Sequence, residues 1–145
     1  MRIWIGLLAL SLAAALLAGC GISAAKDEAE VVANAYFDCI ERGDCEGALG
    51  LFSSQFYQQT SRDDWRAMLE KIEEKLGPLQ SYELAQWRVF KGSQGGLTGT
   101  MVQLHYQATY EKHPAQVSMV VHKPVGGNEF KISGMNINSI GLLIE

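Results

Sequence analysis

The apolar positions divide the chain into an almost unbroken apolar run near the N-terminus, a stretch with helical spacing, and a stretch with strand-like alternation. In the second part, the helical period stops at Gly43, and Asp44 is placed to cap a further helix. A capping-box-like start at Ser61 and a stop at Gly77 bound the clearest helical period. Helices are therefore predicted over about residues 27–42, 44–52 and 61–76.

Beyond Leu79 the helical period disappears, and four segments rich in β-branched and aromatic residues follow. Short links join these segments, and such links permit only hairpins, so the strands should form an antiparallel meander. Three N-terminal helices packed on one face of a curved four-stranded sheet make an α+β fold. In the last segment the apolar phase slips at Gly134, which predicts a β-bulge. The predicted strands lie near residues 80–91, 99–112, 114–123 and 129–140.

The N-terminal apolar run has the three regions of a secretory signal peptide. Arg2 gives a positive start, residues 3–17 form the apolar part, and small residues precede Cys20. The apolar part is shorter than the roughly 20 residues that a membrane-spanning helix needs. The string Leu17-Ala18-Gly19-Cys20 resembles the lipobox of bacterial lipoproteins, in which the signal peptide is cut before a lipidated cysteine. An uncleaved transmembrane anchor and an ordinary signal peptide are the alternatives, and both leave the cysteine at this spacing unexplained.

The lipobox resemblance implies that Cys20 carries a thioether-linked diacylglycerol and, in many bacteria, an amide-linked fatty acid such as palmitate. Several acyl chains hold a protein on a membrane stably, whereas one chain does so only marginally. Gly21 follows the cysteine, in place of the aspartate that retains many enterobacterial lipoproteins in the inner membrane. The expected location is therefore the cell envelope, at the outer membrane facing the periplasm if the cell has two membranes.

Removal of the signal peptide at residues 1–19 leaves 126 of the 145 residues, enough for one domain. A lipidated N-terminus and tether at 20–26 and a single domain at 27–145 are predicted. Without Arg2 the chain has eleven Lys and Arg against sixteen Asp and Glu, a net charge of −5. This mild acidic excess, with no cluster of basic residues, argues against a nucleic-acid partner.

Lipidation of Cys20 would leave an even pair of cysteines in a compartment where disulfides persist. Cys39 and Cys45 flank the predicted turn at Gly43-Asp44, which can bring their Cα atoms within disulfide range. A disulfide between them is predicted, and two small buried thiols that stay reduced are the alternative. A zinc site is not expected, because the pair lacks a nearby second pair of ligands.

Several short motifs occur in order along the chain: Tyr36-Phe37, Gly43-Asp44, Ala48-Leu49, Trp65, Leu76-Gly77-Pro78-Leu79 and Phe130-Lys131-Ile132-Ser133-Gly134. Together they resemble the nuclear transport factor 2-like superfamily, and more closely its bacterial envelope lipoproteins of unknown function. The resemblance covers about residues 28–140 and implies a cystatin-like cone, in which a strongly curved sheet wraps the helices, often with a pocket at the mouth. The superfamily includes enzymes, ligand binders and partner-binding modules, so the fold does not choose a function.

Enzymes of this superfamily generally place a carboxylate, histidine or tyrosine on the concave face of the sheet. Strand alternation instead places His105 and His122 on the outer, solvated face, where they could be cross-strand neighbours. No convergent acid–base set is evident, so neither a catalytic residue nor a metal or other cofactor is predicted. Six residues are candidates for lining a pocket in the cone: Asp38, Tyr57, Trp65, Trp87, Tyr106 and Tyr110.

Two functions remain open on the sequence. The favoured one is a lipid-anchored envelope protein whose noncatalytic domain binds a partner protein or a small apolar ligand in the cone. The alternative is a small hydrolase- or isomerase-like enzyme that uses Asp38 or Tyr57 there. A membrane contact through the lipid is expected, and the outer sheet face could also form a homodimer, as it often does in the superfamily that the chain resembles.

Overall fold

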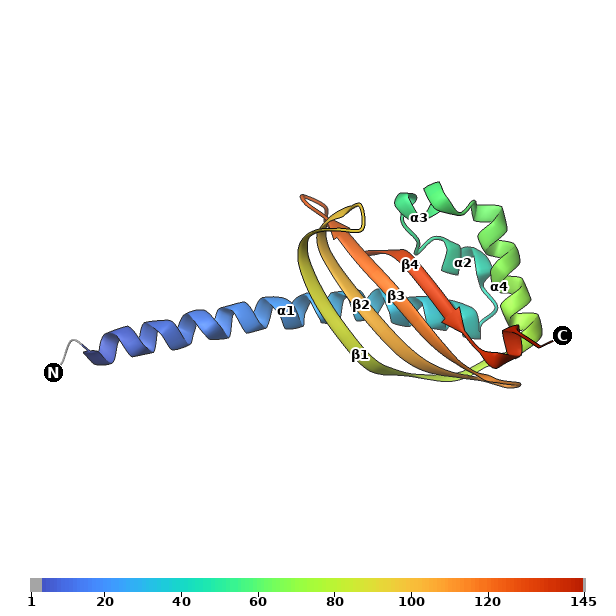
Figure 1. The fold of residues 1–145 in the computed structure, drawn as a ribbon, viewed down its shortest axis with the longest axis horizontal. Coiled ribbons are helices and arrows are strands. Elements are labelled where there is room, and N and C mark those ends of the chain that lie inside the picture. Colours follow the sequence, from blue (N-terminus) through green and yellow to red (C-terminus); the bar gives the residue numbers. More distant parts are fainter. Residues whose placement is uncertain (1–3, 145) are drawn as a thin grey trace.

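The structure, a computed structural model, describes residues 4–144, with side chains described from residue 21 onward. Four helices precede four strands and a final 3₁₀ turn (Figure 1). The α+β fold class is therefore confirmed. In chain order the elements are α1 (Trp4–Glu41), α2 (Cys45–Leu49), α3 (Ser54–Gln59), α4 (Arg62–Leu76), β1 (Leu79–Gln94), β2 (Leu97–Tyr110), β3 (Pro114–Pro124), β4 (Lys131–Asn138) and η1 (Ile140–Leu142).

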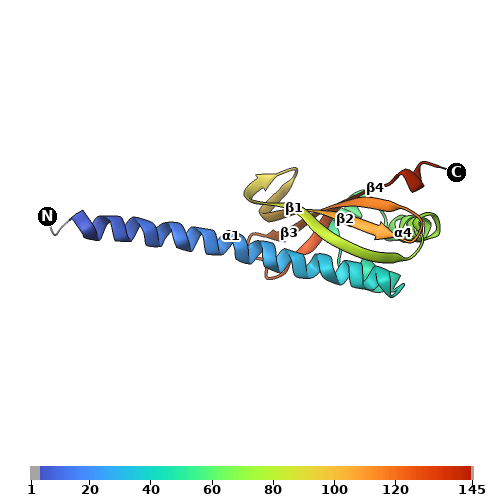
Figure 2. The ribbon, with the colours of Figure 1, turned by 90° about the horizontal axis from the view of Figure 1, so that it is seen from below.

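Helix α1 runs without a break to Glu41, and its first half extends beyond the sheet (Figures 1 and 2). The segment 20–26, predicted to be a lipidated N-terminus and tether, is helical in the structure. The Lys26 ammonium lies 2.7 Å from the Glu30 carboxylate one turn later, a pair that supports helix formation. The side chains of the predicted signal peptide and of Cys20 lie outside the described residues. No helix within the described chain is long and apolar enough to cross a membrane.

Polar caps begin the shorter helices. Asp44 caps α2 by accepting from the Gly47 N–H at 2.9 Å, and Ser61 caps α4 by accepting from the Asp64 N–H at 3.1 Å, as the sequence predicts. Helix α3 is not predicted, although Ser53 caps it through the Phe56 N–H at 3.2 Å. It has six residues and buries none of them, so it leaves no apolar period in the sequence. Four helices therefore precede the sheet, where three are predicted.

The strands pair in the order β1-β2-β3-β4, and each pair is antiparallel, which confirms the predicted meander. Val120 lies opposite Gly134 and Val121 opposite Ile132, so one extra residue of β4 stands between these pairs. This register shift confirms the β-bulge predicted at Gly134. Figure 1 shows the curved strands crossing α1.

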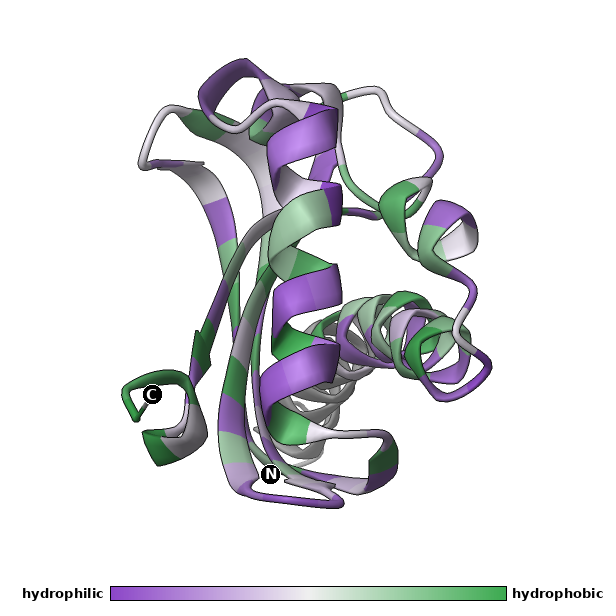
Figure 3. Cartoon of the chain, turned by 90° about the vertical axis from the view of Figure 1, so that its right-hand side faces the viewer, coloured by the Kyte–Doolittle hydropathy of each residue, from purple (hydrophilic) through white to green (hydrophobic). Residues whose placement is uncertain are grey.

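The core lies between α1 and the inner face of the sheet. Phe37 is fully buried, stacks on Tyr82 with ring centroids 4.1 Å apart, and meets Tyr106 edge-on at 4.9 Å. Along β2, every second residue from Val102 to Tyr110 is buried, as the alternation predicts. Figure 3 views the domain from the end that carries the C-terminus, where α4 crosses in front of α1.

The two outer-face histidines differ in their surroundings. His105 is exposed, as predicted, and its Nδ1 lies 2.8 Å from the Ser118 hydroxyl. His122 is only 3% exposed, and its Nε2 lies 2.8 Å from the Thr98 carbonyl oxygen, so its predicted solvation is wrong. The two are not cross-strand neighbours, because His122 pairs with Met101. Alternation assigns a face to each histidine, but it does not show which other segments cover that face.

Candidate functional site

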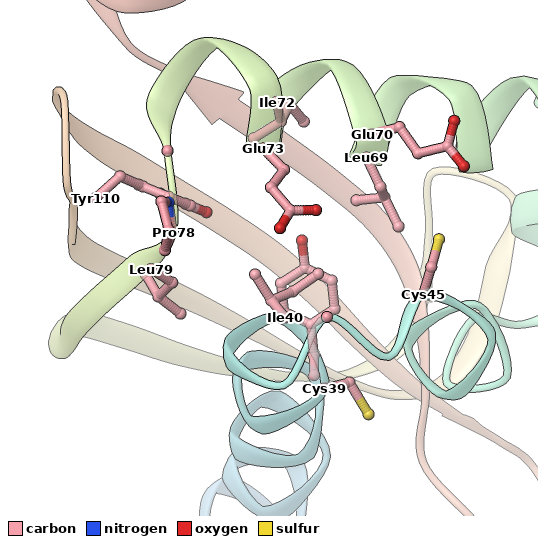
Figure 4. Close-up of a pocket in the computed structure, with 13 residues that line it drawn as sticks. Cys39, Ile40, Cys45, Leu69, Glu70, Ile72, Glu73, Pro78, Leu79 and Tyr110 are labelled. Carbon is pink, nitrogen blue, oxygen red and sulfur yellow. The ribbon is translucent and has the colours of Figure 1, made fainter.

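A pocket lies at the end of the domain where the C-terminal end of α1, the start of α2, α4 and the start of β1 meet (Figure 4). Its cavity measures about 40 Å³. The polar groups on its wall come from two tyrosines, two cysteines and two glutamates: Tyr36, Tyr110, Cys39, Cys45, Glu70 and Glu73. Apolar side chains form much of the remaining wall: Ile40, Leu69, Ile72, Pro78 and Leu79.

The junction between α4 and β1 fixes one wall of the pocket. Gly77 ends α4 with a φ of 78°, a backbone conformation that side-chain-bearing residues rarely adopt. The turn between β2 and β3 binds this junction through the Lys112 N–H to the Leu76 carbonyl and the Glu111 N–H to the Pro78 carbonyl, each at 2.9 Å. As a result, β1 begins opposite the end of β2, and Leu79 pairs with Tyr110.

The phenols and the Cys45 thiol on the wall are protonated at neutral pH. Tyr36 is 1% exposed and Tyr110 is 3% exposed. Burial raises the pKa of Tyr36 well above its ordinary value and the pKa of Tyr110 to about 12. Burial also raises the pKa of the Cys45 thiol, and the Glu70 carboxylate adds to this effect. A protonated thiol is a weak nucleophile, whereas a neutral phenol can donate or accept a hydrogen bond, so these groups suit binding better than covalent chemistry.

The buried phenol of Tyr110 should make the fold sensitive to alkali. Its pKa is about 12 in the folded state and about 10 in the unfolded chain, so the unfolded chain loses the proton first. The stabilising contribution is complete below about pH 10 and falls by up to about 1.4 kcal/mol per pH unit between about pH 10 and 12. Denaturant unfolding across this range should show a smaller loss for Tyr110→Phe than for the wild type. Equal losses in the two proteins would contradict this assignment.

The pocket wall is negatively charged. Glu70 and Glu73 are exposed residues of α4 whose side chains border the pocket, and no Lys, Arg or His is among the described residues that line it. The nearby Arg66 is bound elsewhere, by the carboxylates of Glu46 and Asp63. The pocket therefore combines a largely apolar wall with two carboxylates that have no basic counterpart on that wall.

The structure brings only one of the six predicted pocket residues, Tyr110, to this pocket. Tyr106 and Trp65 are core residues instead, and Trp65 packs edge-on against Phe52 and Phe56 with ring centroids 5.5 and 5.2 Å away. The sequence does not single out Tyr36, Glu70 or Glu73 as site residues. Of these three residues, only Tyr36 belongs to a motif noted in the sequence, Tyr36-Phe37, and this motif is the one feature that could have pointed to it.

The other three predicted residues lie apart from the pocket. Asp38 is exposed on α1. The Tyr57 hydroxyl donates to the Leu49 carbonyl at 2.5 Å. Trp87 pairs with Leu104 in the sheet but is 45% exposed, and the Lys26 ammonium lies 5.8 Å from its ring centroid.

The Tyr106 hydroxyl is buried without a hydrogen-bond partner among the described residues. An unsatisfied buried hydroxyl costs roughly 1–3 kcal/mol, so Tyr106→Phe should leave stability unchanged or raise it by up to about that amount. Burial raises the pKa of this phenol as well, which agrees with a neutral group in an apolar site. Urea unfolding of both proteins measures the difference. A clear loss of stability in the variant would show that the hydroxyl has a partner.

The disulfide predicted between Cys39 and Cys45 is not present in the structure, where both thiols are free. Figure 4 shows the Cys45 side chain directed toward α4 and the Cys39 side chain directed away from it. The Arg42 guanidinium donates to the Cys39 sulfur at 3.6 Å. The turn at Gly43-Asp44 brings the two segments together, as the sequence indicates, but it does not orient the two side chains toward each other.

Fold and pocket together define a small α+β domain in which a single meander sheet packs against a long N-terminal helix. Residues 32–135 match the family described as "Protein of unknown function (DUF4019)", and the chain belongs to this family. The matched segment extends from the second half of α1 into β4 and includes every residue that lines the pocket. Comparison with curated proteins finds no match.

Proposed function

We propose that this chain is a lipid-anchored protein of the bacterial cell envelope whose domain binds another molecule in the end pocket without changing it chemically. The observation that carries the binding role is the state of the pocket wall. Its buried phenols and its Cys45 thiol are neutral beside apolar side chains, which favours recognition over nucleophilic attack.

The lipid anchor is supported by the Leu17-Ala18-Gly19-Cys20 string. The remainder of α1, from residue 21 to Glu41, is a continuous helix about 30 Å long at 1.5 Å per residue. The α1 residues that line the pocket, Tyr36, Cys39 and Ile40, lie near the C-terminal end of this helix, the opposite end from Cys20. With Cys20 at the bilayer surface, the pocket would be available to molecules located away from the lipid, within the envelope.

The fold supports the further proposal of a nuclear transport factor 2-like cone. Its support is the bulged four-stranded meander that crosses α1, together with the short helices that follow α1. The alternative enzymatic role relies on Asp38 or Tyr57, and neither lines the pocket. A homodimer through the outer sheet face stays a prediction.

Photo-crosslinking in the native envelope tests the binding role. The full lipidated chain would carry benzoylphenylalanine at position 74, an exposed position of α4 next to the pocket, or at the matched exposed position 83 on β1. We expect a defined adduct from position 74 that is absent from position 83. The same products from both positions, or no product from position 74, would contradict a binding role for this end of the domain.

A further inference from the structure

The geometry points to a specific occupant for the end pocket: the tip of a lysine side chain from a partner protein, with its ammonium at the Glu73 carboxylate and its methylenes on the apolar wall. This inference rests on the proposed binding function and names the chemistry that the pocket would recognise.

The size of the pocket is the first argument. One water-sized group occupies roughly 10–15 Å³ of such a cavity, so about 40 Å³ has room for about three non-hydrogen atoms. The last three atoms of a lysine, Cδ, Cε and Nζ, match this number. A planar guanidinium places four non-hydrogen atoms at its tip and is wider than an ammonium. A cofactor or a drug-sized ligand needs several hundred Å³.

The second argument is charge. Glu70 and Glu73 lie one turn apart on α4, and Figure 4 shows the Glu73 carboxylate directed toward the Ile40 side of the pocket and the Glu70 carboxylate directed away from it. Neighbouring basic side chains are engaged elsewhere: the Lys75 ammonium donates to the Ile144 carbonyl at 3.1 Å, and the Lys112 ammonium donates to the Glu74 carbonyl at 2.9 Å. A cation from outside the chain would therefore find carboxylates without a competing lysine on the pocket wall.

The third argument is the pair of buried phenols. Tyr36 and Tyr110 are both more than nine-tenths buried, and both line the pocket. Figure 4 shows Tyr110 reaching into the pocket from the side of the sheet. An ammonium has three donors and no acceptor, and phenol oxygens can accept from it. An apolar ligand would offer these hydroxyls no hydrogen bond, so the phenols favour a polar tip, and the neighbouring carboxylates favour a cationic one.

The test uses the full chain in detergent micelles and two small probes. N-acetyl-lysine methylamide carries the ammonium, and N-acetyl-norleucine methylamide carries a similar apolar stem without it. We expect the lysine probe to shift the backbone amide signals of Cys45, Glu73 and Leu79 saturably, with a dissociation constant on the order of 1 mM or weaker. The norleucine probe should produce no saturable shift.

Matched variants on the same helix locate the ammonium. Glu73→Gln should weaken binding of the lysine probe several-fold, whereas Glu74→Gln, whose side chain does not line the pocket, should leave it unchanged. Equal binding of the norleucine probe, tighter binding of N-acetyl-arginine methylamide, equal effects of the two variants, or no binding of the lysine probe would each overturn the lysine assignment. The envelope crosslink from position 74 is a separate readout, so the binding role can stand when the lysine assignment fails.

Discussion

Cys20→Ser should lose all incorporation of labelled fatty acid and should no longer partition with the membrane fraction when expressed in a bacterial host. The thiol is the atom that receives the diacylglycerol in a lipoprotein, and serine offers no equivalent nucleophile. Without its acyl chains the protein also loses the stable anchor that several chains provide. Metabolic labelling with a palmitate analogue, followed by membrane fractionation, measures both effects.

A matched control is available within the same chain. Cys45→Ser removes a thiol that lines the pocket, far from the predicted cleavage site, and should leave acyl labelling unchanged. Labelling of Cys20→Ser at the wild-type level would show that the Leu17-Ala18-Gly19-Cys20 string is not a lipobox.

The second large effect is expected at Gly99, at the start of β2. Gly99 has a φ of 130°, and a Cβ built there would lie 2.3 Å from the Lys123 carbonyl oxygen. Gly99→Ala therefore adds a steric clash to backbone strain, and we expect a loss of about 2–5 kcal/mol in the free energy of unfolding. Chemical denaturation of the two proteins measures this loss.

Gly92 separates the two causes of this loss. It pairs with Gly99 across the β1–β2 ladder and has a similar φ of 124°, but a Cβ there meets no atom within 4 Å. Gly92→Ala should therefore cost only the strain, about 1–2 kcal/mol. If both variants lose the same stability, the contact between β2 and β3 at Gly99 is not as close as the structure shows.

Local signals in the sequence were sufficient for most of the fold. Asp44 and Ser61 cap helices because a side-chain oxygen can reach an N–H three residues later, and this depends only on the nearby chain. The alternation along β2 and the phase slip at Gly134 are equally local, and both agree with the structure. Helix α3 was not predicted because it has no buried residues and therefore no apolar face in the sequence.

The pocket could not be predicted in the same way. Glu70 and Glu73 are polar positions on an amphipathic helix, and this pattern is typical of an ordinary solvent-exposed helix face. They become part of a site only because α4 packs against the end of α1 and the start of β1, segments that are distant in the sequence. Trp87 is the opposite case, a residue predicted to line the pocket that is exposed in the structure. The sheet register places it beside Leu104, but its exposure depends on how far α1 covers the edge strand β1.

The most direct test of the central claim is the alkylation rate of the Cys45 thiol, which lines the pocket and is half-buried. The rate with iodoacetamide would be measured at one pH in intact envelope and in purified full-length protein, with Ser81→Cys on β1 as an exposed reference. Dividing the Cys45 rate by the rate of this reference cysteine removes any difference in the access of iodoacetamide to the two preparations. If a bound molecule occupies the pocket in the envelope, Cys45 should react several-fold more slowly there than in purified protein, while the reference cysteine reacts equally in both. Equal rates for Cys45 in the two preparations would contradict the claim that this pocket is a binding site.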